Sequence, residues 1–398
     1  MSRMQIAGVI FVVMAMVLPV ACSPQAAPAP IATPQASSPT KAAQPTATAT
    51  KAPSRVSDAE WERTVEAAKA EGSVVLVTAA GDEARRALAA GFKNAYGINL
   101  ETIFGQDSAR ILAERRAGLN FTDSVIFGSS TIVNDLKANG VLDSLEPVLV
   151  LPELTDPTLI ARTWYGGKLP WVDNDHMMFM GLLYPAAPIA INTNLVKASD
   201  VQSLRDLLNP KWKGQMILND PTIVGFSGSN FMPMIILGGV AGGADWLRDL
   251  VKNEPVVMRD QRMMLDWLAH GKVAIVIAPK PDTALEFIRA NAPIATITPK
   301  EGTVLSGSAS VVVVTKGRPH PNATKLFVNW YLSKEGQTVF SRGYGGQSAR
   351  EDVPTDFLPP QQLRQPGTTY FIKDEEEKLK KGPEVFKTAK EILAPLMK

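Results

Sequence analysis

Few side chains in this sequence could carry out acid–base or metal chemistry. The three histidines, His176, His270 and His320, are scattered along the chain. His270 ends a predicted helix, where a cation suits the helix dipole, and His320 lies between two prolines, which favours a turn. His176 follows Asp173 and Asp175 in DNDHMMF. Such residues can bind metal ions, but the pattern favours a surface loop, and we predict no metal ligand.

Motifs of known catalytic chemistry are missing from the sequence. It contains no GxxxxGK[ST] loop for nucleotide phosphates, no GxGxxG turn, no HExxH zinc pair and no GxSxG nucleophile. A serine nucleophile would also need one of the three histidines as its base, and none has a recognisable local signature. We therefore predict neither an enzyme nor a bound cofactor.

The charge of the chain limits its partners. Its 398 residues include 41 Lys and Arg against 39 Asp and Glu. Residues 1–54 hold three of these cations and no acid, so residues 55–398 contain 38 cations and 39 anions. Nucleic-acid-binding proteins carry a clustered basic surface, so we expect no nucleic-acid partner. At about 150 residues per domain, the length predicts two or three compact units.

The first 22 residues read as a lipoprotein-type signal peptide. Arg3 is followed by an apolar run from Ile6 to Val20, which at about 15 residues is shorter than a bilayer-spanning helix. Ala21 and Cys22 follow at once and resemble a lipobox, although Pro19 holds the place where leucine is usual. We predict that Cys22 is lipidated and anchors the protein outside the cytoplasm. An ordinary signal peptide with an incidental cysteine is the alternative.

Residues 23–54 have the composition of a tether. Of these 32 residues, 26 are Pro, Ala, Ser or Thr, and none is aromatic. Such a stretch cannot bury enough apolar surface to offset the loss of chain entropy. We expect a semi-extended tether that holds a folded body away from the membrane, with a glycosylated stalk as the alternative.

From residue 57 onward, apolar runs and helical patterns alternate. Strands are predicted at 74–78, 99–104 and 124–127, with helices at 83–96, 108–117 and 131–139 between and after them. This order predicts a parallel sheet in an α/β fold. Ligands bind outside the carboxyl ends of such strands, so the loops 79–82, 105–108 and 128–130 should line one rim.

The alternation resumes later in the chain. Strands are predicted at 188–192, 215–219, 273–278 and 309–314, and helices at 246–251 and 261–269. A long amphipathic helix over 322–337 should turn Leu326, Trp330 and Phe340 toward a core. The charged residues 374–381 are interpreted as a solvated helix surface, and a helix over 384–398 closes the chain.

Two stretches resemble a known family. From Asn192 the chain reads NTNLVKASDVQSLRDLLNPKWKGQMILNDP, and from Gly317 it reads GRPHPNATKLFVNWYLSKEGQTVFSRGYGGQSAREDV. Both resemble extracellular solute-binding proteins of ABC importers, specifically the ferric-iron-binding group and its relatives in family 1. The shared features are the NPKWKG turn before a strand that ends in DP, and the HP and EGQ of the second stretch. The resemblance covers residues 57–353.

The resemblance implies a periplasmic-binding-protein-like fold of type II, in which two α/β lobes are joined by hinge strands. Lobe 1 would comprise residues 55–182 and 303–345, and lobe 2 residues 183–302 and 346–398. The hinge would be crossed near 180–185 and near 302–307. The protein would act as a monomer that captures a small solute between the lobes and delivers it to permease subunits.

One departure from the family pattern concerns the solute. In the iron-binding members two adjacent tyrosines follow the strand that reads VAIVIA here, whereas this chain has Pro279 and Lys280. An ammonium group repels a ferric ion and attracts carboxylate, phosphonate or phosphate. We therefore expect an anion or a metal chelate as the solute, with no metal held directly by the protein.

By position, the cleft should be formed by small and polar residues of both lobes. Exposed NH groups at helix starts and hydroxyl groups suit an anion. Capping of helices is the alternative role for the serines. Arg259 and Arg262, which flank Gln261, are further candidates. The predicted solute-binding residues are Thr78, Ala79, Gly81, Ser108, Ser129, Ser130, Ser227, Ser229, Gln261 and Lys280.

Two other functions remain open at the level of sequence. One is an enzyme on the same two-lobed scaffold, which would need a nucleophile or an acid–base pair facing the cleft. The other is a sensory solute-binding lipoprotein that presents its lobes to a membrane partner without transport. Solute capture is preferred because signal, tether, lobe order and motifs agree.

Overall fold

The computed structural model describes residues 58–105, 108–222, 233 and 237–397, which belong to one compact unit. The predicted signal peptide with Cys22, the tether, and the site candidates Ser227 and Ser229 lie outside the described residues. In the described part, no helix has both the length and the apolar character that crossing a bilayer requires.

The first sheet has the strand order β2-β1-β3-β13-β4, and β5 also pairs with β13. As predicted, β1, β2 and β3 are parallel. The sheet departs from a purely parallel one at β13, which runs antiparallel to its neighbours β3, β4 and β5. The strands span Ser73–Thr78 (β1), Asn99–Phe104 (β2), Ser124–Phe127 (β3), Leu142–Asp143 (β4), Phe179–Met180 (β5) and Val311–Thr315 (β13).

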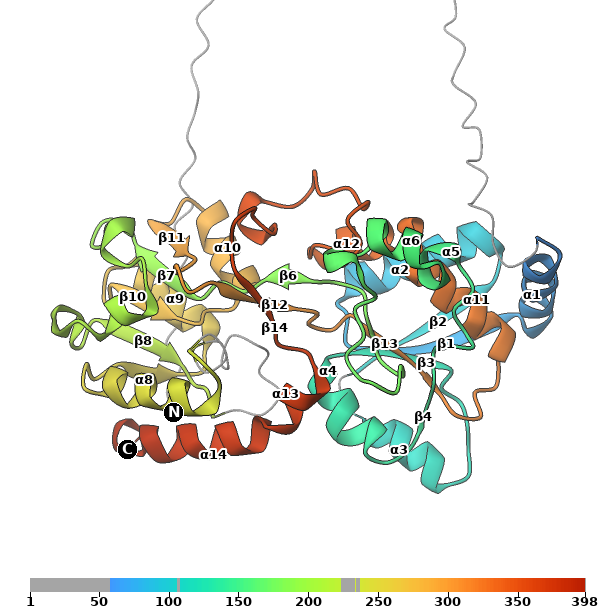
Figure 1. The fold of residues 1–398 in the computed structure, drawn as a ribbon, viewed down its shortest axis with the longest axis horizontal. Helices are drawn as coiled ribbons and strands as arrows, with labels where there is room; N and C mark the ends of the chain where they lie inside the picture. Colours follow the sequence, from blue (N-terminus) through green and yellow to red (C-terminus); the bar gives the residue numbers. More distant parts are fainter. Residues whose placement is uncertain (1–57, 106–107, 223–232, 234–236, 398) are drawn as a thin grey trace, which may run out of the picture. The chain divides into compact units, whose positions relative to one another are not determined.

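Helices surround this sheet in Figure 1, where α1 packs against α11 and α2 against α12. The prediction of a single helix over 322–337 is wrong, because the helix is interrupted at Ser333. The extended backbone of Ser333 ends α11, and its side chain accepts a hydrogen bond from Gly336 N to begin α12. The helices span Asp58–Glu71 (α1), Asp82–Tyr96 (α2), Ala109–Arg116 (α3), Ser129–Thr131 (α4, continued by a π-helical turn to Lys137), Pro152–Thr155 (α5), Pro157–Thr163 (α6), Pro321–Leu332 (α11) and Lys334–Tyr344 (α12).

The second sheet has the order β11-β7-β10-β8-β9, in which β10, β8 and β9 are parallel. The three central strands β7, β10 and β8 are buried on both faces, since successive side chains point to opposite sides and both sides are covered. In β10, Ile275 and Ile277 join one core, and Val276 joins the other. The strands span Ile189–Asn192 (β7), Met216–Asn219 (β8), Val256–Met258 (β9), Ile275–Ile277 (β10) and Ile294–Ile297 (β11).

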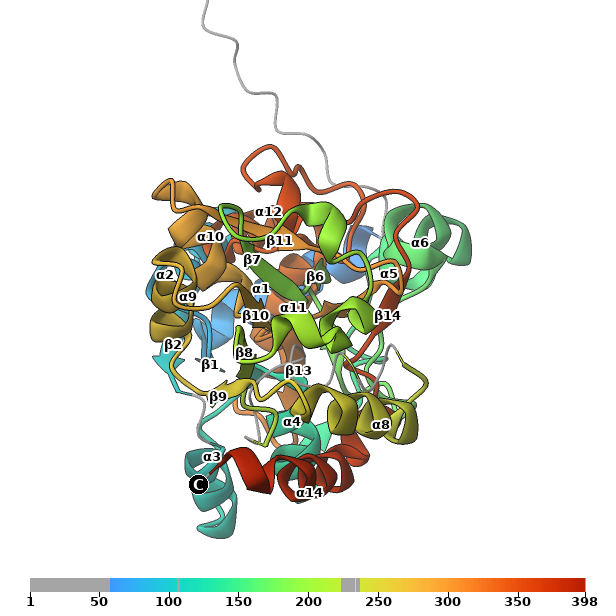
Figure 2. The same ribbon diagram turned by 90° about the vertical axis from the view of Figure 1, so that its left-hand side faces the viewer.

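Two pairs of helices cover the faces of the second sheet (Figure 2). Met264 and Leu268 of α9 pack with Val276, together with Ala284 of α10. On the opposite face, Leu250 of α8 and Ala389 of α14 pack with the isoleucines of β10. These helices span Val240–Val251 (α8), Gln261–Ala269 (α9), Pro281–Arg289 (α10) and Gly382–Leu393 (α14).

Three further strands form a small third sheet from the segments that connect the two larger ones. β12 (Thr303–Ser306) pairs antiparallel with β6 (Tyr184–Pro185) and parallel with β14 (Tyr370–Ile372). The two predicted hinge segments are therefore hydrogen-bonded to each other, and a segment near the C-terminus joins them. After β14 the chain forms α13 (Glu376–Lys380) and then α14.

We predict that Phe92→Ala lowers the free energy of unfolding by about 3–5 kcal/mol, because it leaves a cavity in the first core. Phe92 is fully buried, with its ring centroid 5.5 Å from those of Tyr96, Phe327 and Trp330. Urea unfolding followed by tryptophan fluorescence measures the change. The matched control is Phe121→Ala, at a side chain that is 53% exposed, which should shift stability by at most about 0.5 kcal/mol.

Candidate functional site

The carboxyl ends of β1, β2 and β3 meet at one edge of the first sheet. Thr78 is paired in register with both Phe104 and Ile126, so the loops that follow these strands leave the sheet side by side. This confirms the predicted rim for loops 79–82 and 128–130. In loop 105–108, residues 106–107 lie outside the described part.

Thr78, Ala79 and Gly81 occupy different environments in the first loop. The hydroxyl of buried Thr78 donates to Ile126 O at 3.0 Å and accepts from Ala80 N at 3.1 Å, so it ties the loop to β3. Ala79 N also donates to Ile126 O. Gly81 is exposed at the N-cap of α2, and a Cβ added there would meet no atom within 4 Å. Of the three, Gly81 offers open surface beside free helix-terminal NH groups.

Ser108 and Ser129 already use their hydroxyls inside the protein. Ser108 Oγ donates to Asp135 Oδ2 at 2.5 Å, and Ser129 Oγ donates to Asp374 Oδ1. Both side chains are buried, whereas Ser130 is half-buried. To contact a solute, Ser108 and Ser129 would have to give up or share their hydrogen bonds to Asp135 and Asp374.

Asp374 is a residue of this rim that sequence reasoning missed. Its side chain is 1% exposed, and its Oδ2 accepts from Gly307 N at 2.8 Å, just beyond β12. Lys373 Nζ lies 3.2 Å from Oδ1. The interpretation of residues 374–381 as a solvated surface is thus wrong at Asp374. The composition of the segment is that of an exposed helix, and only the tertiary fold shows which residue turns inward.

At the edge of the second sheet the structure brings Gln261 and Lys280 together. Gln261 begins α9 after β9, and its Oε1 accepts from Lys280 N at 2.8 Å. Lys280 is exposed and caps α10. The turn before it is fixed by Ala278, which has a φ of 58° and donates its NH to Pro188 O. A left-handed alanine is strained, and such strain is often found at ligand-binding loops.

Asp220 and Arg259 form a second polar group at this edge. Asp220 is buried and accepts from Thr222 N at 2.8 Å, from Thr222 Oγ1 at 2.6 Å and from Arg259 Nε at 2.8 Å. Burial opposes ionisation, but the hydrogen bonds from Thr222 and Arg259 outweigh it and hold the pKa of Asp220 below its ordinary value. Asp220 is the acid of the DP motif, yet its partner Arg259, just after β9, is 39 residues away in sequence.

Ser308 and Tyr344 were also missed, and they lie at the rim of the first sheet. Ser308 has a φ of 46°, and its Oγ lies 2.6 Å from the hydroxyl of Tyr344 at the end of α12. A Cβ on Gly128 would lie 3.8 Å from Ser308 O. Nothing local in the sequence signals this meeting of the hinge segment with loop 128–130.

One cluster of carboxylates has the spacing of a metal site. Within the described ranges, Asp173, Asp175 and Glu376 bring one oxygen each within 4.8 Å of the others. The ammonium of Lys137 lies among them, at 2.7, 2.8 and 2.9 Å from the three carboxylates. Partial burial disfavours the charged form of Lys137 and lowers its pKa. The hydrogen bonds to the three carboxylates outweigh this effect and raise the pKa of Lys137 above its ordinary value. A lysine cation thus takes the place that a metal ion would occupy.

His176 lies beside this cluster without joining it. Its Nδ1 is 2.6 Å from Glu146 Oε1, and its ring stacks on Trp171 with centroids 4.6 Å apart.

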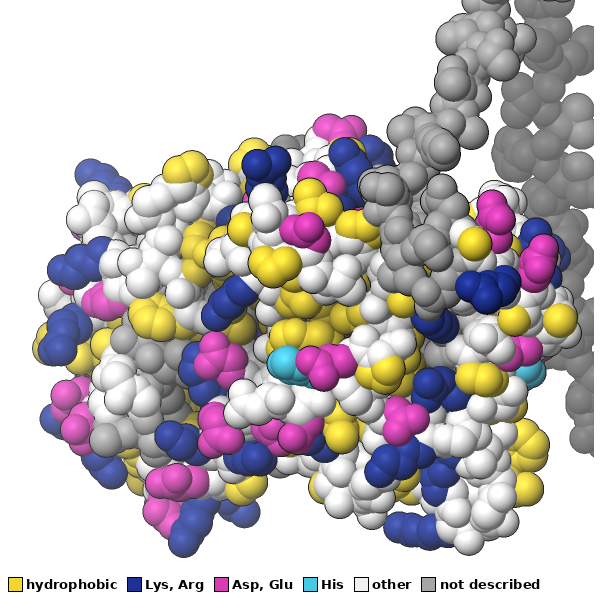
Figure 3. All heavy atoms as spheres, turned by 45° about the vertical axis from the view of Figure 1, so that its right-hand side comes forward, with side chains coloured by type: hydrophobic (Ala, Val, Ile, Leu, Met, Phe, Trp, Pro, Cys, Tyr) yellow, Lys and Arg dark blue, Asp and Glu magenta, His cyan; other side chains and the backbone are white. Residues whose placement is uncertain are grey.

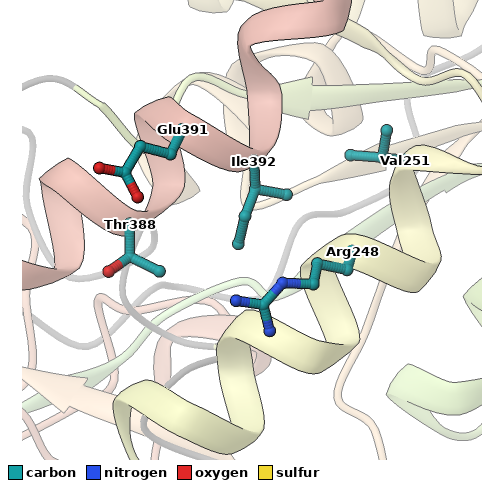
Figure 4. Close-up of a pocket in the computed structure, with 5 residues that line it drawn as sticks. All are labelled: Arg248, Val251, Thr388, Glu391 and Ile392. Carbon is teal, nitrogen blue, oxygen red and sulfur yellow. The ribbon is translucent and has the colours of Figure 1, made fainter.

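The surface shows two further features. On the face in Figure 3, Lys and Arg side chains are interspersed with Asp and Glu. The absence of a nucleic-acid partner stays a prediction. A hollow with a volume of about 400 Å³ lies between α8 and α14, and Figure 4 shows the side chains that line it. It is lined by Arg248, Val251, Thr388, Glu391 and Ile392, and therefore by none of the predicted solute-binding residues.

Comparison with known proteins identifies the family. A family model described as bacterial extracellular solute-binding protein matches residues 135–374, which is more than half of the chain. The protein belongs to this family. The resemblance found in the two sequence stretches is thereby confirmed.

Three similar proteins place this family membership in context. An uncharacterized protein of Haemophilus influenzae is 29% identical over 192 residues, which span 46% of this chain and about half, 53%, of that protein. A Trichodesmium protein, IdiA or FutA, solved with iron and citrate, is 17% identical, with a TM-score of 0.62 over 81% of this chain and 99% of its own. AfuA of Actinobacillus pleuropneumoniae, solved with fructose 6-phosphate, is 21% identical, with a TM-score of 0.57 over 81% and 99%. These structures confirm the predicted type II periplasmic-binding-protein fold.

The pKa of Asp220 predicts a pH-dependent contribution to stability. A carboxyl group with a lowered pKa in the folded state stabilises the fold above its unfolded pKa of about 3.9. That contribution to stability is lost as the pH falls from the unfolded-state pKa to the lower pKa of the folded state. Asp220→Asn should therefore be less stable than the wild type at pH 7, and the gap should narrow steadily below about pH 4.

Urea midpoints measured from pH 7 to pH 3 provide the comparison. Asp245→Asn is the control, since Asp245 is 78% exposed in its pair with Arg248. It should cost at most about 1 kcal/mol at any pH in this range. A gap between Asp220→Asn and the wild type that stays constant with pH would contradict the account.

Proposed function

We propose that this protein is the substrate-binding component of an ABC importer. It captures a small anionic solute or metal chelate between two lobes and delivers it to permease subunits. The lobes are residues 55–182 with 303–345 and residues 183–302 with 346–398. The observation that carries the proposal is the arrangement of two α/β sheets, each ending in polar loops at its strand edge, joined by the small sheet of β6, β12 and β14.

The charge at the strand edges supports an anionic solute. Lys280 is exposed on the second sheet, where the family's iron-binding members carry tyrosines, and Gln261 lies in contact with it. On the first sheet, Gly81 opens the N-terminus of α2, where NH groups and the helix dipole favour negative charge. Serines 108, 129 and 130, with Thr78 and Ala79, would shape the rest of this rim. Ser227 and Ser229 remain candidates from lobe 2.

The solutes named for two related structures, iron with citrate and fructose 6-phosphate, share anionic oxygen groups. A cationic and NH-rich cleft suits solutes of that chemistry. We expect binding without turnover, because binding of the solute and closure of the lobes are the whole task of a receptor.

The proposal extends to the cellular setting. Lipidation at Cys22 would hold the protein on the periplasmic or cell-surface side of the cell membrane, and residues 23–54 would let the folded part reach the permease. A hinged receptor works as a monomer, so no partner copy is needed.

Native mass spectrometry tests the proposal on the purified protein, before and after addition of ferric citrate. We expect an organic or phosphorus-containing adduct that is weakened about tenfold or more in Lys280→Ala, because a charge-assisted hydrogen bond to the solute is lost. Lys272→Ala, at the other end of α9, is the control and should bind as the wild type does. An adduct of bare iron would contradict an anion-binding cleft.

A further inference from the structure

Two neighbouring strands of the second sheet, β8 and β9, are each followed by a charged residue, and the two residues form a pair. β8 and β9 are parallel, and Asn219 is paired in register with Met258. Asp220 and Arg259 are the first residues after these two strands, and Asp220 N donates to Met258 O at 2.9 Å. Their side chains thus leave the sheet together at its carboxyl edge.

The carboxylate of Asp220 is fixed by its surroundings. Its side chain is 2% exposed, and both oxygens are used: Oδ1 by the NH and hydroxyl of Thr222, and Oδ2 by Arg259 Nε. A buried carboxylate with donors on both oxygens has little freedom to turn. It therefore acts as a rigid support for the arginine.

Arg259 is held at Nε by Asp220, and its side chain as a whole is largely exposed. Its side chain is 65% exposed, and its hydrogen bond to Asp220 uses Nε. The Nη1 and Nη2 groups carry four of the five guanidinium N–H donors and form the end of the planar fork. An arginine fixed through Nε presents this fork in one orientation, which suits a two-oxygen contact with a carboxylate or phosphate.

A nearby arginine on the same segment shows the contrast. Arg262 is 76% exposed and uses its terminal Nη1 in a 3.1 Å pair with Glu286, which is itself 59% exposed. That is an ordinary surface ion pair, in which another side chain occupies the end of the fork. Because the end of its fork is paired with Glu286, we no longer count Arg262 among the solute-binding candidates, and it serves as the matched control.

Arg259 also lies on the same sheet edge as the predicted site. Gln261 follows two residues later and contacts Lys280 N at 2.8 Å, so the first residue of α9 lies against the loop that follows β10. The acid between them, Asp260, caps α9 by accepting from Met263 N. Two cationic side chains thus share this edge, while its acids are used in capping and pairing.

We propose that Arg259 is the residue that selects the oxyanion group of the solute, and that Asp220 is the positioning residue that orients it. The Nη pair receives two oxygens of a carboxylate, phosphate or phosphonate group. Lys280 attracts the anionic group electrostatically but does not fix its orientation, because an ammonium acts as a point charge. This inference rests on the proposed function and adds to it the residue that sets solute chemistry.

The experiment measures binding of citrate, fructose 6-phosphate and inorganic phosphate by calorimetry on the purified protein. We expect at least one probe to bind, with affinity reduced about tenfold or more in Arg259→Lys, which keeps the charge and loses the fork. Arg262→Lys should stay within about twofold of the wild type. Circular dichroism establishes that each variant is folded.

A spectroscopic readout separates positioning from mere structural support. In protein labelled with ¹⁵N-arginine, the Nε–Hε signal of Arg259, assigned through Arg259→Lys, should shift when the probe binds. In Asp220→Asn that signal should move and broaden before any probe is added, and affinity should fall about fivefold or more. An unchanged signal in folded Asp220→Asn would overturn the positioning role.

The outcomes distinguish this inference from the proposed function. If a probe binds equally well to Arg259→Lys, the inference is wrong and solute capture stands. If none of the probes binds but a neutral solute co-purifies, the inference is again wrong and solute capture stands. If no solute of any kind binds, both fail.

Discussion

The connection between the two sheets depends on the hydrogen bonds that the buried carboxylate of Asp374 accepts. This carboxylate accepts hydrogen bonds from Ser129 Oγ at the start of α4 and from Gly307 N at the end of β12, with Lys373 Nζ at 3.2 Å. A buried charge is tolerated only when its partners replace water. The segment after β14 is therefore fixed to the first sheet and to the hinge strand together.

The same segment then continues to the other half of the protein. Two residues on, Glu376 pairs with Lys137, and α14 goes on to pack in the core of the second sheet. The chain thus passes three times through the small third sheet, in β6, β12 and β14. A movement of one sheet relative to the other must be accommodated in these short strands, which is the physical basis for the hinge that we propose there.

The sequence predicted the regular elements well because they follow local patterns. Strands β1 to β3 were predicted from the alternation of apolar runs and helical patterns. The loops of the rim were predicted from the rule that ligands bind at the carboxyl ends of such strands. The contact of Gln261 with Lys280 agrees with their common assignment to one cleft. The broken helix was missed because its apolar spacing continues through Ser333, whereas the break is a capping interaction that apolar spacing does not show.

Other features depended on contacts between distant parts of the chain. Whether a serine hydroxyl faces solvent or a buried acid is decided by residues far away, as in Ser129 and Asp374, which are 245 positions apart. The support of Arg259 by Asp220 requires β9 to lie beside β8, which periodicity does not show. Charge composition alone favoured an exposed surface for residues 374–381, although one acid of that segment is among the most buried in the described chain.

The central claim is that solute binding closes two lobes across the third sheet. Fluorescence transfer between dyes at Lys93→Cys and Lys272→Cys, in a Cys22→Ala background, measures this directly. Both positions are exposed, one on α2 and the other beyond α9. The account predicts that transfer changes to a new, saturable value as the solute identified by mass spectrometry is added. Binding of that solute with no change in transfer would contradict closure.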